Sequence, residues 1–266
     1  MVSFAVLLVF TLAVLYPLIA VVLNSLKSQT EFFNNPWLWP KHFVFSNYTY
    51  AWKQAHIPRF MLNSLIVAGS TTLLTMIISS LAGYAFARFR FPGRKPMFLL
   101  FAILLIVPAP ISVIPLYVIV AELHLIDTYW SLILPYVAGG LPLSIYLLRA
   151  FFATIPPELT DAALIDGCSP FGAFWRVVLP LSRPGLATVG ILSFVNAWNE
   201  FFLALIFIHN QSLMTLPLGL QTFVYQYHVE WPYYFAGLAA AMIPIIVVYL
   251  ALQRQFIRGM TAGAIR

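Results

Sequence analysis

Three polar residues lie close together in an otherwise apolar stretch of the chain. Asn196, Asn199 and Glu200 are spaced at i, i+3 and i+4, so they share one face of a helix. A charge inside a membrane-spanning helix costs about 2.5–3.5 kcal/mol, so it should face protein or water. The pattern therefore fits contact with a solute or its path, and it also fits a hydrogen-bonded seam to another helix.

Other reactive side chains do not form a recognisable site in the sequence. There is no G-x-x-x-x-G-K-[ST] phosphate loop, and so no visible means of binding ATP. The single cysteine, Cys168, has no partner, and the five histidines are scattered without metal-ligand spacing. No nucleophile with a base and an orienting group can be assembled. We therefore expect a non-catalytic subunit with no metal or cofactor of its own.

The composition indicates an all-α integral membrane protein. Of the 266 residues, 62% are hydrophobic and only 8% are charged, whereas a soluble domain has roughly 25% charged residues. A helix that crosses the bilayer needs about 20 apolar residues. Uncharged runs, the fifth interrupted only by Glu200, predict six spans in one transmembrane domain, residues 1–266: about 2–26, 61–87, 97–121, 128–148, 186–208 and 233–253. The first is expected to be a retained helix and not a signal peptide, with a native start upstream left open.

The basic residues predict the orientation. The net charge is +6, but the lysines and arginines sit in short segments between spans, which argues against nucleic-acid binding. Ten of the fourteen fall on one side and four on the other. The richer side should be cytoplasmic, with both termini inside, in the manner of a bacterial cytoplasmic (inner) membrane protein.

Helix breakers interrupt the third and fourth predicted spans. Proline kinks a helix, and lipid tolerates the kink only where neighbours or water satisfy the freed carbonyl. The breakers fit either a shaped packing seam or the wall of a pathway. They are Pro108, Pro110, Pro115, Pro135, Gly139, Gly140 and Pro142.

The inner connection at residues 149–183 is longer than helix linkage requires. It predicts two short helices, the first opened by Pro156 and Pro157 and capped at its end by Gly167. Ser169 should cap the second helix, and Pro180 should end it.

Each of these two short helices is predicted to group particular side chains on one face. At 100° per residue, Phe171, Phe174 and Val178 share one face of the second helix. Glu158, Asp161 and Ile165 share a face of the first helix, with Ala162 beside them. Apolar groups on a cytoplasmic loop need cover from the chain's own helix ends, from the lipid interface or from a partner protein. The carboxylates weaken the lipid alternative, because the inner leaflet is itself negative.

The segment DAALIDGCSPFGAFWRVVLP resembles the EAA loop of binding-protein-dependent ABC importer permeases. That pattern is Glu-Ala-Ala, three residues, Gly, nine residues and Ile-x-Leu-Pro. This sequence has Asp161, Ala162, Ala163, Gly167 and 177–180 (VVLP) at the same spacing, with Asp for Glu and Val for Ile. The stretches IDTYWSLILPY, FVNAWNEFFLAL and LQRQFIRGMTAGAIR extend the likeness to the maltose-type, carbohydrate-uptake subfamily.

The resemblance implies a function and a set of partners. It implies a sugar, oligosaccharide or related solute, an extracytoplasmic solute-binding protein, a second homologous permease, and two ATP-binding cassette subunits that carry ATP and Mg²⁺. It also implies that the loop is a coupling helix docked on the ATPase. The residues to which it assigns this docking are Glu158, Asp161, Ala162, Ala163, Gly167, Phe171, Phe174 and Pro180.

Two alternatives belong to other classes. A secondary transporter driven by an ion gradient would use Glu200 as its coupling site, but it predicts inverted repeats and a paired intramembrane acid, and the sequence shows neither. A structural membrane protein would predict that no solute flux depends on this chain. Co-purification with a nucleotide-binding subunit would favour the importer over both alternatives.

Overall fold

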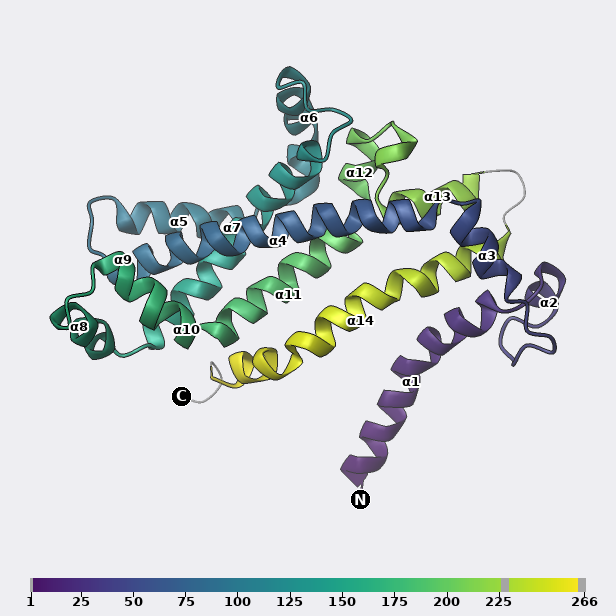
Figure 1. Ribbon diagram of the computed structural model, residues 1–266, viewed down its shortest axis with the longest axis horizontal. Coiled ribbons are helices and arrows are strands. Elements are labelled where there is room, and N and C mark those ends of the chain that lie inside the picture. Colours follow the sequence, from purple (N-terminus) through teal and green to yellow (C-terminus); the bar gives the residue numbers. More distant parts are fainter. Residues whose placement is uncertain (1, 226–229, 263–266) are drawn as a thin grey trace. The chain divides into compact units, whose positions relative to one another are not determined.

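The computed structural model describes residues 2–225 and 230–262, and this part of the chain is helical with short connections and no strand (Figure 1). It divides into two compact units. Unit 1 comprises residues 1–64 and 210–246, and unit 2 comprises residues 65–209 and 247–266. Each of two long helices, α4 (Ile57–Arg88) and α14 (Trp231–Ala262), belongs partly to unit 1 and partly to unit 2.

Unit 1 gathers the two connections that are predicted to lie on the outer side, 27–59 and nearly all of 209–231. Besides the parts of α4 and α14, it contains α1 (Val2–Ser25), α2 (Gln29–Asn34), α3 (Ser46–Lys53), the 3-10 turn η3 (Gln211–Leu213) and α13 (Leu216–Tyr225). Most side chains of α1 from Phe4 onward are exposed, as expected for a helix whose surroundings are lipid or another subunit.

A buried lysine fastens the end of α1. Lys27 is fully buried, and its Nζ donates to Asn24 Oδ1 at 2.8 Å and to the carbonyl oxygens of Asn35 at 2.8 Å and Pro36 at 3.2 Å. Burial lowers the pKa of Lys27, an effect that the Glu31 carboxylate partly opposes. The Lys27 carbonyl in turn accepts from Asn47 Nδ2 at 2.8 Å, which ties α1 to α3.

The connection after residue 209 is held against the start of α4. Asn63 Nδ2 donates to the carbonyl oxygens of Ser212 and Met214, at 3.0 and 2.8 Å. Gly219 lies against the Phe60 ring, where an added Cβ would stand 2.2 Å from Cδ2. Only glycine permits this approach, so α13 packs closely onto the start of α4.

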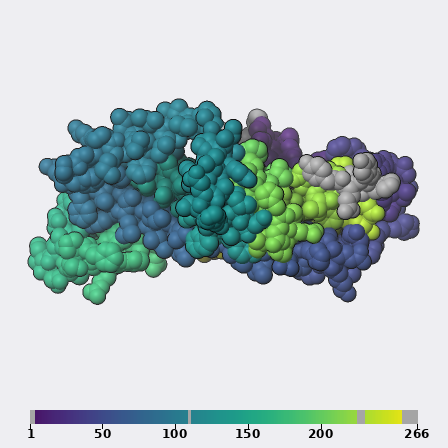
Figure 2. Space-filling model, turned by 90° about the horizontal axis from the view of Figure 1, so that it is seen from above, coloured from purple at the N-terminus to yellow at the C-terminus, as the bar shows by residue number. Residues whose placement is uncertain are grey.

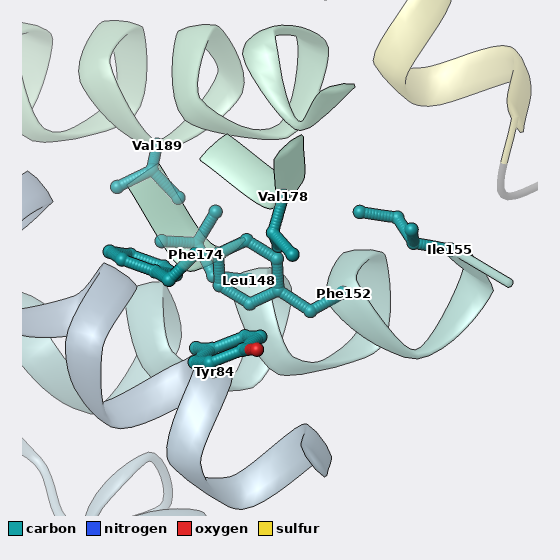
Figure 3. Packing of buried hydrophobic residues seen from close by; sticks show 7 residues of the cluster. All are labelled: Tyr84, Leu148, Phe152, Ile155, Phe174, Val178 and Val189. Atoms are coloured by element: carbon teal, nitrogen blue, oxygen red, sulfur yellow. The ribbon is translucent and has the colours of Figure 1, made fainter. Parts of the chain in front are cut away.

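Unit 2 carries the long connection at residues 149–183 that is predicted to lie on the inner side. Its helices are the larger part of α4, then α5 (Arg94–Leu104), η1 (Ala109–Ser112), α6 (Val113–Glu122), α7 (Trp130–Thr154), α8 (Pro157–Ile165), α9 (Pro170–Ala173), the π-helical turn η2 (Phe174–Val178), α10 (Leu179–Leu181), α11 (Arg183–Asn199) and α12 (Phe202–Phe207). An aromatic and aliphatic cluster joins α4, α7, η2 and α11: Tyr84, Leu148, Phe152, Ile155, Phe174, Val178 and Val189 (Figure 3).

The helices can be compared with the six predicted spans. Four are long and apolar enough to cross a membrane: 4–25, 57–88, 130–154 and 231–255. The third predicted span, 97–121, is divided among α5, η1 and α6, and the fifth, 186–208, is interrupted between α11 and α12. Counting the bent pair 170–181 and 183–199 as one span gives five. Six spans remain a prediction for the chain in its bilayer.

Candidate functional site

The inner connection forms two short helices as predicted, each with its own cap. Pro157 stands in the first turn of α8, and Gly167 follows its end at φ +85°. The Gly167 N–H donates to the Leu164 carbonyl at 3.1 Å and the Cys168 N–H to the Ala163 carbonyl at 2.9 Å, which is a Schellman motif. These bonds fix the corner between α8 and α9.

The second short helix begins as predicted but ends differently. Ser169 Oγ accepts from the Gly172 N–H at 3.1 Å and so caps α9. The prediction that Pro180 ends the helix is wrong, because the chain stays helical to Leu181. Pro180 follows the π-helical turn η2 and lies at the start of α10, where a missing N–H costs little. The path then bends by 77° before α11.

The three residues predicted to share an apolar face of the second helix differ in their exposure. Phe174 is 2% exposed and Val178 is buried, both within the chain's own cluster (Figure 3). The Phe174 ring centroid lies 4.8 Å from that of Tyr84 and 6.3 Å from that of Phe152. Phe171 is 62% exposed. Thus Phe174 anchors the loop to its own helices, whereas Phe171 is free to meet something else.

The first helix presents an open face. Glu158, Asp161 and Ala162 are exposed, and Ile165 is 86% exposed, whereas Ala163 of the same helix is buried. Figure 2 shows this green segment at one edge of the view, standing out beyond the blue atoms of α4 and α5. The structure therefore brings carboxylates and exposed apolar side chains together on one projecting corner.

A hydrogen bond from Arg88 holds the chain just before the α8–α9 corner. Arg88 stands at the last turn of α4, and its Nη2 donates to the Ile155 carbonyl, just before α8. Together with the Phe174 contacts, this bond links the α8–α9 corner to both α4 and α7. A force applied to the corner would reach these helices directly.

A cavity of about 630 Å³ lies among α4, α6, α7, α11 and α12. Polar groups from α4, η1, α7 and α11 meet there, and no lysine or arginine is among the described residues that line it. Thr71 is 2% exposed, and within the described chain its Oγ1 has no hydrogen-bond partner. The other polar side chains on the wall are Ser112, Tyr136, Ser144, Ser193, Asn196 and Glu200.

Glu200 marks the break between α11 and α12. Its backbone is extended, and its carboxylate accepts from the Leu203 N–H at 2.8 Å and the Ala204 N–H at 3.3 Å. It also accepts from the Tyr136 hydroxyl of α7. The carboxylate therefore caps α12 and joins it to α7, and these bonds compensate for placing its charge here.

The three polar residues predicted to share one face do not act alike. Asn196 and Glu200 line the cavity, whereas Asn199 is exposed, lies outside the lining and donates its Nδ2 to the Val195 carbonyl at 3.0 Å. Sequence reasoning did not single out Thr71, Tyr136, Ser144 or Ser193. The helix breakers were the available signal, since Pro135, Gly139 and Gly140 line the cavity as the pathway-wall interpretation expects.

Comparisons with known proteins agree with this architecture. The chain is 39% identical over 257 residues to the probable ABC transporter permease protein YurM of Bacillus subtilis, covering 97% of this chain and 85% of the relative. It is 34% identical over 260 residues to the arabinooligosaccharides transport system permease protein AraQ of the same organism, covering 96% and 92%. A bacterial ABC transporter involved in alginate import shares the fold, with a TM-score of 0.84 at 24% identity over 96% of this chain and 95% of the other.

The family assignment rests on most of the chain. Residues 75–262 match the family described as binding-protein-dependent transport system inner membrane component. The match includes the α8–α9 corner and every residue that lines the cavity except Thr71 of α4. This protein therefore belongs to the inner membrane components of binding-protein-dependent transport systems.

Proposed function

We propose that this permease forms half of the membrane pathway of an ATP-driven importer for a sugar or oligosaccharide. A second homologous permease supplies the other half, a solute-binding protein delivers the solute, and two ATP-binding cassette subunits bind and hydrolyse ATP with Mg²⁺. The family description supports dependence on a binding protein. The relative named for arabinooligosaccharides supports the substrate class.

The exposed α8–α9 corner is the observation that carries this proposal. Ile165 and Phe171 are 86% and 62% exposed on a segment whose backbone is fixed by the caps of Gly167 and Ser169. Rigid, exposed apolar groups beside carboxylates fit a protein partner better than an anionic membrane surface. The partner is an ATPase subunit, whose cleft takes the apolar side chains while a cation pairs with Asp161.

The buried anchor explains how movement of the ATPase reaches the pathway. Phe174 packs on Tyr84 of α4 and Phe152 of α7, and the same two helices carry Thr71 and Gly140 of the cavity wall. Closure of the ATPase subunits on ATP draws the corners of the two permeases together. The helices of unit 2 then shift with their corner and convert an inward-open pathway to an outward-open one.

The cavity suits a neutral solute rich in hydroxyl groups. Thr71, Ser144, Ser193 and Asn196 supply donors and acceptors, and the aliphatic part of the wall packs on sugar C–H groups. The buried Thr71 hydroxyl can gain a hydrogen bond from a passing solute. The Glu200 carboxylate, in a lining without lysine or arginine, disfavours an anion.

The proposed orientation has the outer connections facing the solute-binding protein. We assign the segments 27–59 and 209–231 to that docking face, with both termini in the cytoplasm and the chain in a bacterial-type inner membrane. The bonds from Asn63 to residues 212 and 214 support this role, because they hold the second segment in one conformation. Residues 226–229 lie outside the described part of the chain.

Co-purification tests the docking proposal. Phe171→Ala should reduce the amount of ATPase subunit that co-elutes in mild detergent at least tenfold, as loss of a central aromatic contact does. Phe10→Ala on α1 is the matched control, since Phe10 is 68% exposed and its loss removes the same apolar area. Equal effects of the two substitutions would contradict the docking role of the α8–α9 corner.

Uptake kinetics test the cavity separately. Asn196→Ala should raise the KM of solute uptake about fivefold, the equivalent of one hydrogen bond of roughly 1 kcal/mol. Asn199→Ala serves as the control, because this residue of the same helix does not line the cavity. An unchanged KM in Asn196→Ala, or the same change in both variants, would remove Asn196 from the solute path.

A further inference from the structure

A second pocket in unit 2 is basic and lies away from the cavity. It has a volume of about 520 Å³ and is lined by Arg94, Lys95, Phe98, Leu99 and Ala102 of α5 together with Arg149 of α7. Three cations thus surround a wall that is otherwise apolar. Neither the docking corner nor the solute path uses this pocket.

The position of two of these cations is unfavourable for α5 alone. Arg94 and Lys95 occupy its first turn, which contains no acidic residue, and the N-cap Gly93 offers no side-chain acceptor. The N-terminal end of a helix carries partial positive charge, so cations placed there are repelled and an anion there is stabilised. An anion in the pocket would remove this repulsion.

The chain itself supplies no such anion in its described part. Within residues 2–225 and 230–262, none of these three cations forms a salt bridge with a carboxylate. Arg149 is instead held over the Phe98 ring, with its Cζ 3.8 Å from the ring centroid. This contact fixes the guanidinium beside the pocket while leaving its N–H donors available.

The adjoining surface of α5 is apolar and open. No residue of this helix is buried, and Met97, Leu99, Leu100 and Ile103 are each about half exposed or more. In a membrane protein such a face meets acyl chains. The pocket therefore lies where a helix surface changes from charged to apolar, as at the boundary between lipid headgroups and tails.

We propose that the pocket of Arg94, Lys95 and Arg149 binds the phosphate headgroup of an anionic phospholipid. The phosphate oxygens accept from the three cationic side chains, and one acyl chain lies along Leu99 and Ile103. Basic pockets between helices on the cytoplasmic side of membrane proteins suit such headgroups. These arginines and this lysine fall on the side with more basic residues, which agrees with an anionic inner leaflet.

Lipid binding can be measured on the intact complex by native mass spectrometry, with phosphatidylglycerol as the probe and phosphatidylcholine as the zwitterionic comparison. The wild type should retain phosphatidylglycerol preferentially. In Arg94→Gln/Lys95→Gln its affinity should fall about 30-fold, because each basic residue contributes about a factor of five. Arg90→Gln/Arg183→Gln is the matched control: it removes the same charge from exposed positions outside the pocket and should leave the affinity unchanged.

Three results would overturn the assignment. One is equal phosphatidylglycerol affinity in the two double variants. Another is displacement of the lipid by millimolar inorganic phosphate, which would indicate a site for free phosphate. The third is loss of a protein subunit from Arg94→Gln/Lys95→Gln with the lipid retained, which would indicate a protein interface.

Discussion

Replacing Phe174 and Phe171 by alanine, one at a time, separates folding from docking. Both rings belong to the loop that resembles the coupling helix, but only Phe174 is buried. Burying its ring contributes about 3 kcal/mol. Its contacts with Tyr84 at 4.8 Å and Phe152 at 6.3 Å add about 0.5–1 kcal/mol. Phe174→Ala should therefore destabilise the permease by about 4 kcal/mol, within the range for buried phenylalanines.

Thermal unfolding in mild detergent measures this difference. A loss of about 4 kcal/mol corresponds to a Tm lowered by roughly 8–16 °C for a chain of this size. Phe171→Ala should shift the Tm by less than about 2 °C, since an exposed ring contributes within about 0.5 kcal/mol, while it weakens ATPase binding. The reasoning fails if both variants lose the same stability, or if Phe174→Ala unfolds like the wild type.

Three further changes test the local geometry. Gly219→Val should destabilise the chain by at least 1–3 kcal/mol, because its side chain meets the Phe60 ring, and Phe60→Ala should partly restore the Tm in the double variant. Gly167→Ala should cost about 1–2 kcal/mol for its φ of +85° without any clash, and Gly167→Asn should cost less; a Tm series that ranks asparagine below alanine would contradict the left-handed cap. Burial lowers the pKa of Lys27 below 10.5, so the native state releases this proton before the unfolded state does, and stability gains from this group as pH rises toward 10.5. In Lys27→Met the increase of stability with pH that is due to this group should be absent. Parallel curves of Tm against pH for the wild type and the variant would contradict the buried-lysine explanation.

Local signals predicted the elements that depend on local chemistry. The long uncharged runs predicted α4 to within about four residues and the starts of α7 and α14 to within about two, although both of these helices continue well beyond the predicted ends at 148 and 253. Gly167 and Ser169 form the caps expected of them. Such features depend on hydropathy and on hydrogen bonds between residues that are near in sequence. They required no knowledge of neighbouring helices.

The remaining features depend on contacts that spacing does not encode. Counting 100° per residue places Phe171 and Phe174 on one face, but η2 departs from α-helical geometry and α4 and α7 cover only Phe174. Glu200 is a single charge in a run that was predicted to be one continuous span. Its hydrogen bonds to the first turn of α12 therefore could not be predicted from the sequence. The prolines signalled kinks in residues 97–121, yet they did not predict that α5, η1 and α6 would be separate.

The fastening of α1 has a consequence for how freely its sequence can vary. Residues 4–19 of its apolar segment are all exposed, whereas Asn24 and Ser25, the last two residues of the helix, are buried. Just beyond them the Lys27 amino group donates to three acceptors at once. Exchanges among leucine, valine, isoleucine and phenylalanine along that segment should leave this chain's own fold intact. Selection on the first helix for folding is thus concentrated at its C-terminal end, in a few polar atoms. The rest of its length is constrained by contact with the membrane and with other subunits.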